Sequence, residues 1–275
     1  MKFFINVILS FNTVCKKYNI IIYNIIYMSL LKFPKSLIMG KNNYIESGVK
    51  ILENVIIGNN NKIYSGTVIY PNTIIGNNNV ILDNNILGEH PILSTEIFTE
   101  KKFNGLEIGN NNFFHTSNKI YSGYSSKTII NNNNKILGES HIGHDVHIYN
   151  NVNIYPRSLV CGYVKMLDYS GMGVYSVIHQ KKIIGDYAFI GMNNTITKNI
   201  FPFYININHN HNHKYSKLNR HIMNNKDILT QINDNEIIIN EILLKYQDKT
   251  LNLKNYYDLI PINIYNIIEN FLSNE

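Results

Sequence analysis

The most constraining feature of this 275-residue chain is an aliphatic or large apolar residue that recurs every six positions. The series comprises Met39, Ile45, Ile51, Ile57, Ile63, Ile69, Ile75, Ile81, Leu87, Ile108, Phe114, Ile120, Ile130, Ile136, Ile142, Ile148, Ile154, Val160, Met166, Met172, Ile178, Ile184, Ile190 and Ile196. A six-residue period fits neither a 3.6-residue helix nor a strand that alternates every two residues. The unbroken run from Ile130 to Ile196 argues against an accidental register, even though Asn and Ile each make up about a sixth of the chain.

Hexads of this kind predict a parallel β-helix in which each hexad is one short strand and a turn. The aliphatic residue points into the prism, and a Gly or Asn, as in IGNNNK at 57–62, provides the left-handed backbone conformation at the corner. Stacked Asn side chains are expected to form amide ladders. With three hexads to a triangular coil, the series predicts a mainly β fold over residues 39–200, a left-handed parallel β-helix of about eight coils.

Two interruptions of the repeat, at 88–107 and 121–129, predict loops ejected from the coils, and long loops commonly carry function. The NHNHNH tract at 208–213 marks the exit from the coils. Apolar residues at three- and four-residue spacing over 228–247 and 256–272 then predict helices, so residues 201–275 form a C-terminal helical region. Residues 1–38 fit neither part, and three interpretations stay open: an organelle-targeting leader, an extension upstream of a start at Met28, or a capping helix.

Charge and cysteine content narrow the class of protein. The formal net charge of +6 comes from abundant lysines in a chain with one alanine and two arginines, a skew typical of an A/T-rich gene. It therefore argues only weakly for nucleic acid, and a basic face suits docking of an acidic protein better. Cys15 and Cys161 are too few for a disulfide scaffold, and no Cys/His spacing matches a structural zinc site. Apolar residues interleaved with Asn argue against a stable membrane span.

The densest candidate site is the stretch His141-Ile142-Gly143-His144-Asp145 together with Cys161-Gly162 and His179-Gln180. Residues eighteen apart stack in this fold, so His144, Gly162 and Gln180 form a column. Imidazole can accept a proton near neutral pH, and a glycine N–H can approach a developing oxyanion without steric hindrance. Asp145 can orient His144 only near a corner, because neighbouring strand residues point to opposite faces.

At these residues the chain resembles the acyl-carrier-protein-dependent UDP-N-acetylglucosamine O-acyltransferases that open lipid A biosynthesis. The resemblance covers about residues 39–200 and rests on HIGHD at 141–145, Cys161-Gly162, IHQ at 178–180 and Gly88-Glu89. It implies that His144 is the general base, that Asp145 holds it and that Gly162 donates to the oxyanion. It also implies substrate-binding roles for His141, His179, Gln180, Glu89 and Arg220, and a role for Met192 as a ruler of acyl-chain length.

The resemblance further implies a homotrimer that takes its acyl group from the phosphopantetheine of acyl carrier protein and passes it to UDP-N-acetylglucosamine. No metal or other cofactor is expected, and the location is cytoplasmic, or plastid or mitochondrial if residues 1–38 are a leader. Tyr163 departs from the family, which usually has a histidine there, and so does HPILSTE after Gly88-Glu89.

Three alternatives stay open. One is a hexapeptide-repeat sugar acyltransferase or acetyltransferase that uses acyl-CoA, and another is a catalytically inactive trimeric scaffold. The third is a metal site of the carbonic-anhydrase type, which is disfavoured because His141, His144 and His147 are three apart and scatter over the coil.

Overall fold

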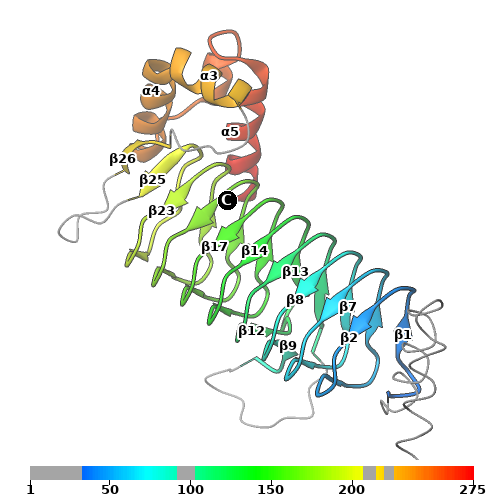
Figure 1. Ribbon diagram of the computed structural model, residues 1–275. Coiled ribbons are helices and arrows are strands. Elements are labelled where there is room, and N and C mark those ends of the chain that lie inside the picture. The colour runs from blue at the N-terminus through cyan, green and yellow to red at the C-terminus, as the bar shows by residue number, and fades with distance from the viewer. Residues whose placement is uncertain (1–32, 92–102, 207–214, 220–225) are drawn as a thin grey trace, which may run out of the picture. The chain divides into compact units, whose positions relative to one another are not determined.

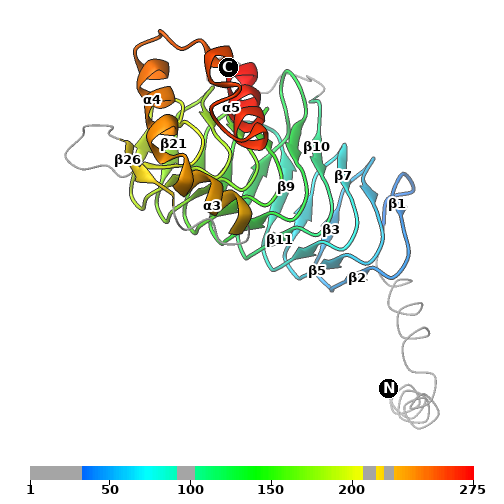
Figure 2. The same ribbon diagram turned by 90° about the horizontal axis from the view of Figure 1, so that it is seen from above.

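The computed structural model describes residues 33–91, 103–206, 215–219 and 226–275 (Figure 1). By its contacts the chain divides into two units, Met1–Lys35 and Ser36–Glu275. The second unit is a parallel β-helix followed by helices (Figures 1 and 2). The expected leader or extension at 1–38 lies almost entirely outside the described residues, as do the NHNHNH tract and Arg220.

Three sheets form the sides of the prism, and their strands are parallel except for the last strand of the second sheet, which pairs antiparallel with its neighbour. Sheet A consists of β1 (Ile38–Met39), β4 (Ile56–Ile57), β7 (Thr73–Ile75), β10 (Leu106–Ile108), β13 (Thr128–Ile130), β16 (His147–Ile148), β19 (Lys165–Met166) and β22 (Ile183–Ile184). Sheet B consists of β2 (Tyr44–Ile45), β5 (Lys62–Ile63), β8 (Val80–Ile81), β11 (Phe113–Phe114), β14 (Lys135–Ile136), β17 (Asn153–Ile154), β20 (Gly171–Met172), β23 (Phe189–Ile190), β25 (Tyr204–Asn206) and β26 (Tyr215–Leu218). Sheet C consists of β3 (Lys50–Ile51), β6 (Val68–Ile69), β9 (Ile86–Glu89), β12 (Lys119–Tyr121), β15 (His141–Ile142), β18 (Leu159–Val160), β21 (Val177–Ile178) and β24 (Thr195–Ile196).

The six-residue series is the core of this prism. Every member lies in a strand, and all are buried except Met39, which is half-buried in the first strand. Members pair with the member of the next coil, as in Ile57 with Ile75 and Ile142 with Val160. The strands β1 to β24 make eight coils of three, and β25 adds to sheet B beyond them, which confirms the predicted β-helix.

The corners depend on Asn more than on Gly. The left-handed residue is the third after the aliphatic one, as at Asn60 and Asn78, with φ of 57° and 58°. Gly48 and Gly66 also take this position, with φ of 88° and 73°, so a Gly or Asn provides the left-handed corner there as predicted. Gly58, directly after the aliphatic residue, has no positive φ and serves another purpose. It is required for space, because a Cβ on Gly58 would lie 2.5 Å from the carbonyl oxygen of Gly76 in the next coil.

Asparagine side chains stack in amide ladders, as predicted, and two of these ladders extend over several coils. In the first, the Asn79 amide donates to Asn61 and the Asn112 amide donates to Asn79, at 3.0 and 3.1 Å between buried side chains. Because each buried amide finds its partner in the next coil, burial costs little. The second ladder contains Asn59, Asn77, Asn110, Asn132 and Asn150 and ends on the carboxylate of Asp168.

Both interruptions of the repeat leave the prism at one corner, where the chain passes from sheet C to sheet A, here called the C–A edge. The first lies between β9 and β10, and the second between β12 and β13. Residues 92–102 of the first loop lie outside the described part of the chain, whereas the second loop is described completely. His144 and Asp145 lie at the same edge, between β15 and β16.

The C-terminal region contains α3 (Lys226–Asp234), α4 (Glu236–Gln247), the 3-10 helix η2 (Leu253–Tyr256) and α5 (Ile262–Asn274). The predicted single helix over 228–247 is divided at Asn235, because Asp and Asn favour helix ends over helix interiors. The helix predicted from 256 begins only after Pro261, since the residue before a proline avoids the helical conformation. Helix α5 ends against sheet A, where Lys165 donates to the Asn274 carbonyl at 3.2 Å.

Candidate active site

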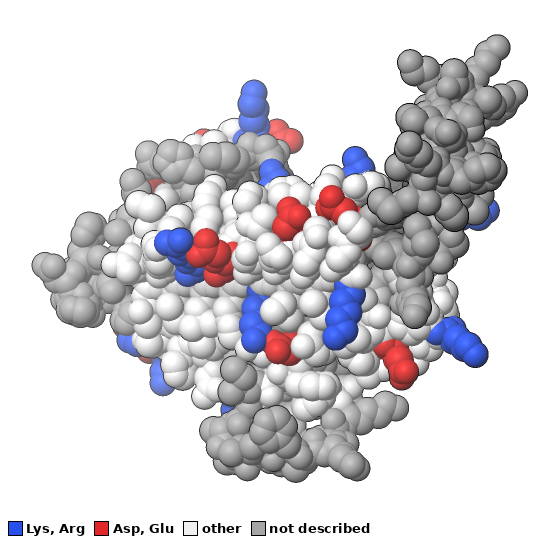
Figure 3. Space-filling view, turned by 60° about the horizontal axis from the view of Figure 1, so that its bottom comes forward, with Lys and Arg blue, Asp and Glu red and all other residues white. Residues whose placement is uncertain are grey.

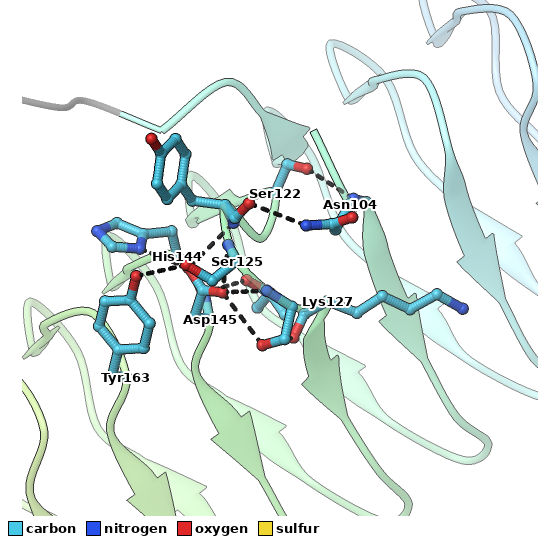
Figure 4. Close-up of polar contacts among 11 residues, drawn as sticks. Asn104, Ser122, Ser125, Lys127, His144, Asp145 and Tyr163 are labelled. Atoms are coloured by element: carbon cyan, nitrogen blue, oxygen red, sulfur yellow. Dashed lines mark hydrogen bonds and ion pairs between the residues drawn. The ribbon is translucent and has the colours of Figure 1, made fainter. Parts of the chain in front are cut away.

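The candidate site begins at the corner that follows β15. Asp145 has a φ of 58°, so it occupies the left-handed corner position of its coil. Asp145 can orient His144 only near a corner, and the two residues do meet at one. Nδ1 of His144 lies 2.7 Å from Oδ2 of Asp145 (Figure 4). The His144 side chain keeps 20% of its surface exposed while the Asp145 side chain has none. The buried aspartate therefore holds the imidazole from the inside of the corner, and the imidazole faces outward.

The second ejected loop encloses the Asp145 carboxylate (Figure 4). The backbone N–H of Tyr124 donates to Oδ2 at 3.0 Å, and those of Ser125 and Ser126 donate to Oδ1 at 2.8 and 2.5 Å. The Ser126 hydroxyl adds a fourth bond at 3.1 Å. Successive backbone amides that converge in this way form an anion-binding nest.

These bonds decide the ionisation of Asp145. Burial by itself raises the pKa of the Asp145 carboxyl, but hydrogen bonds from the Ser126 amide, the His144 ring and the neighbouring amides outweigh it and hold the pKa below its ordinary value. The carboxylate is consequently ionised at neutral pH and accepts a hydrogen bond from Nδ1–H of His144. That tautomer leaves a lone pair on Nε2, the nitrogen that can take a proton from a substrate.

Gly162, one coil beyond His144, lies directly beside the imidazole. A Cβ placed on Gly162 would lie 2.8 Å from Cε1 and 2.9 Å from Nε2 of His144, so only glycine fits without moving the ring. Among the described residues, no acceptor bonds the Gly162 N–H. Asn132 occupies the same position in its hexad, two residues after the buried aliphatic residue, and its N–H donates to the Asn150 side chain. The stacking of His144 on Gly162 that the sequence predicted is confirmed, and it places an N–H donor beside the imidazole.

His179 and Gln180 continue the column one coil further. Both side chains are exposed, and the amide of Lys181 donates to the Gly162 carbonyl at 3.0 Å. Cys161 is half-buried beside them with a free thiol, and burial raises its pKa. The column therefore presents an imidazole, an amide and a carboxamide along one edge.

His141 and Glu89 occupy the outer side of sheet C, below the column. The His141 ring packs on Tyr121 with centroids 4.9 Å apart, and burial, with a smaller effect of Lys119, lowers its pKa. Lys119 forms an ion pair with Glu89 at 2.6 Å. Glu89 and His141 are thus linked through Lys119 and Tyr121 rather than by direct contact.

One predicted site residue is not brought to this edge. Met192 follows β23 at the corner between sheets B and C, where it is 73% exposed, so one chain does not place it beside His144. Arg220 lies outside the described residues. The three histidines of the metal alternative scatter as expected, since His147 lies on sheet A and stacks on Tyr149 at 4.0 Å.

The sequence predicted no role in the site for the loop residues Tyr124, Ser125 and Ser126, which bind the Asp145 carboxylate. Their contribution is mainly through backbone amides, which no side-chain motif reveals. The available signal was the placement of the interruption at 121–129, one coil before HIGHD.

Charge on the molecule is mixed. On the face seen in Figure 3, basic and acidic side chains lie singly or in small groups among uncharged residues, without a single-signed stripe. No described group of three His, Cys, Asp or Glu side chains could hold a metal ion. No helix in the described part of the chain combines the length and apolarity needed to cross a membrane.

The family model for the bacterial transferase hexapeptide (six repeats) matches residues 37–71. A relative from Nautilia profundicola, an acyl-[acyl-carrier-protein]–UDP-N-acetylglucosamine O-acyltransferase, is 36% identical over 155 residues, 53% of this chain and 60% of the relative. A protein with the same name from Xylella fastidiosa is 37% identical over 111 residues, 38% of this chain and 42% of the relative. The matches thus span less than two thirds of these relatives.

Among solved structures, a UDP-N-acetylglucosamine acyltransferase from Bacteroides fragilis superposes with a TM-score of 0.74 at 26% identity. That match covers 88% of this chain and 94% of the other, so it includes the coils and most of the C-terminal region. The resemblance drawn from the sequence is confirmed: this chain carries the hexapeptide repeat and is similar, in sequence over about half of its length and in fold over most of it, to the UDP-N-acetylglucosamine O-acyltransferases.

Proposed function

We propose that this protein is an acyltransferase that moves a 3-hydroxyacyl group from acyl carrier protein to the 3-hydroxyl of UDP-N-acetylglucosamine. The observation that carries the proposal is the arrangement of His144 between the ionised Asp145 and the N–H of Gly162. A base beside an unbonded amide donor suits attack of a hydroxyl on a thioester. The similar proteins act on the same acceptor, which supports the choice of substrates.

In the proposed reaction, Nε2 of His144 takes the proton of the sugar hydroxyl while the hydroxyl oxygen bonds to the thioester carbon. The carbonyl oxygen becomes an oxyanion that accepts a hydrogen bond from Gly162 N–H. The carbon–sulfur bond then breaks, and the imidazolium returns the proton to the leaving thiolate of phosphopantetheine. General-base catalysis of this kind contributes about 10²–10⁴-fold, and one oxyanion donor about 10²–10³-fold. None of these steps requires a metal ion or redox cofactor.

The other proposed roles follow from position. His179 and Gln180 are exposed beyond Gly162, where the sugar nucleotide would bind, and His141 with Glu89 lines the edge below. The column faces outward, so enclosure of substrate needs a second wall. A homotrimer with cyclic symmetry supplies that wall three times. In that assembly Met192 of a neighbouring copy would line the acyl groove.

The direct test is an assay of the purified full chain with UDP-N-acetylglucosamine and two donors, 3-hydroxyacyl-acyl carrier protein and acetyl-CoA, with products identified by mass spectrometry. We expect an O-acylated sugar nucleotide from the carrier-protein donor only. Turnover with acetyl-CoA alone would favour the rival acetyltransferase, and absence of turnover with either donor would favour the inactive scaffold.

A further inference from the structure

Tyr163 contacts both the His144 ring and Ser125 of the second ejected loop, although the sequence predicted no role for it. It occupies the corner position one coil beyond Asp145, with a φ of 62°, and its amide donates to the His144 carbonyl at 3.0 Å. Its ring stands edge-on to the His144 ring, with centroids 5.1 Å apart and planes at 88°. Its hydroxyl lies 2.9 Å from the Ser125 hydroxyl (Figure 4).

These contacts close a ring around the catalytic pair. Tyr163 bonds Ser125, the amide of Ser125 donates to Asp145, Asp145 accepts from His144, and the His144 ring packs back on Tyr163. Loosening one link therefore affects the others. The Ser125 side chain is exposed, and among the described residues the Tyr163 hydroxyl is the group that ties the Ser125 hydroxyl to the coil.

The neighbouring coil fixes Tyr163 in turn. The Lys181 ammonium lies over the Tyr163 ring, 5.8 Å from its centroid. A tyrosine ring with only two side-chain torsions, held on one side by a cation and meeting an imidazole edge-on, loses little entropy when it orders a partner.

We propose that Tyr163 is a positioning residue: its hydroxyl keeps the amides of the 122–127 loop on Asp145, and its ring fixes the plane in which Nε2 of His144 meets the acceptor hydroxyl. The proposal rests on the proposed function for its kinetic consequences, but its structural part stands on the contacts alone. Tyr163 itself transfers no proton and touches no reacting atom.

The kinetic test compares Tyr163→Phe, Ser125→Ala and the double variant. Because both single variants remove the same hydrogen bond, each lowers kcat by about 3- to 10-fold with KM unchanged, and the double variant falls no further. Ser125→Thr keeps the hydroxyl and retains kcat. The control is Tyr169→Phe, a tyrosine in the same backbone conformation at the A–B corner that stacks on Tyr187. Additive losses, or an unchanged kcat in Tyr163→Phe, would overturn the positioning role.

A second measurement does not depend on activity. Hydrogen exchange of the Tyr124–Ser126 amides is expected to quicken by about 3- to 10-fold in Tyr163→Phe and to stay the same in Tyr169→Phe. Unchanged exchange in Tyr163→Phe would overturn the anchoring of the loop. If the wild-type chain turned over neither donor while exchange still quickened, the proposed function would fail and the anchoring would stand, so the two failures are distinguishable.

Discussion

The imidazole of His144 leaves no room for a side chain at Gly162, because a Cβ there would approach both Cε1 and Nε2 to within 2.9 Å. Gly162 has no positive φ, so alanine is compatible with its backbone and its effect is purely one of space. Gly162→Ala is therefore expected to displace the ring from the acceptor hydroxyl and lower kcat by at least about 10²-fold, the scale of a lost general base. Thermal melting checks that the coils remain folded, and near-wild-type turnover would show that the close fit of Gly162 does not control the position of the His144 ring.

His144→Ala removes the proposed base. Turnover is expected to fall by at least about 10²-fold while stability changes little, because the side chain is partly exposed and outside the core. Steady-state kinetics with the carrier-protein donor measures this. His147→Ala, a histidine on sheet A, serves as the matched control and should retain turnover. Retained activity in His144→Ala would disprove the base.

Asp145→Asn keeps the size of the side chain but replaces one acceptor oxygen with an NH₂ group that faces backbone N–H donors. We expect a loss of kcat of about 10²-fold or more together with a lower melting temperature, since buried donors lose their acceptor. In the wild type, the lowered pKa of Asp145 means that its contribution to stability is present above the ordinary carboxyl pKa and is lost as the pH falls through the folded-state value. Asp145→Asn should lack that acid-side decline.

A second carboxylate predicts the opposite pH dependence. Asp186 follows Asp168 in the ladder column, is 5% exposed, and has one carboxylate oxygen without a hydrogen-bond partner among the described residues. Burial, and then the charge of Asp168, raises its pKa from 3.8 to about 7. A folded-state pKa above the unfolded value means that stability is full below about pH 4 and declines as the pH rises to about 7.

Asp186→Asn should remove this decline, because an amide continues the ladder without a charge. At pH 8 the variant is expected to be more stable than the wild type by up to about 4 kcal/mol, from 1.36 kcal/mol per pKa unit. Denaturant unfolding at pH 5 and pH 8 measures the difference, with the exposed Asp258→Asn as control. Parallel stability curves for wild type and Asp186→Asn would show that Asp186 does not titrate in this range.

Met192→Gly tests the proposed ruler. A methionine at the end of an acyl groove excludes longer chains, so the wild type is expected to prefer a medium-length 3-hydroxyacyl donor and the variant a longer one. The shift should be about ten- to hundred-fold in relative kcat/KM. Asn193→Gly is the control, because Asn193 already has a positive φ that glycine adopts without strain. Identical chain-length profiles would assign the ruler to another residue.

The sequence predicted the repeating coils in detail, and the two loops and the C-terminal helical region in outline. Positions such as Ile57 and Ile142 could be placed because a fixed period determines both their strand and their buried face. The stacking of His144 on Gly162 followed from the same arithmetic. The nest around Asp145 could not be predicted, because it consists of backbone amides in an irregular loop. The break between helices α3 and α4 at Asn235 could not be predicted either, because the apolar three- and four-residue spacing continues across it.

The shared exit of both loops at the C–A edge also constrains how this chain can change in length. A residue added within a strand would move every later aliphatic side chain from the interior to the surface and misalign both ladders. An insertion at this edge leaves the following coil in register, as the pairing of Leu106 with both Thr73 and Thr128 demonstrates across the two loops. The corner that holds His144 is therefore also the place where the chain can gain or lose residues while the prism stays the same.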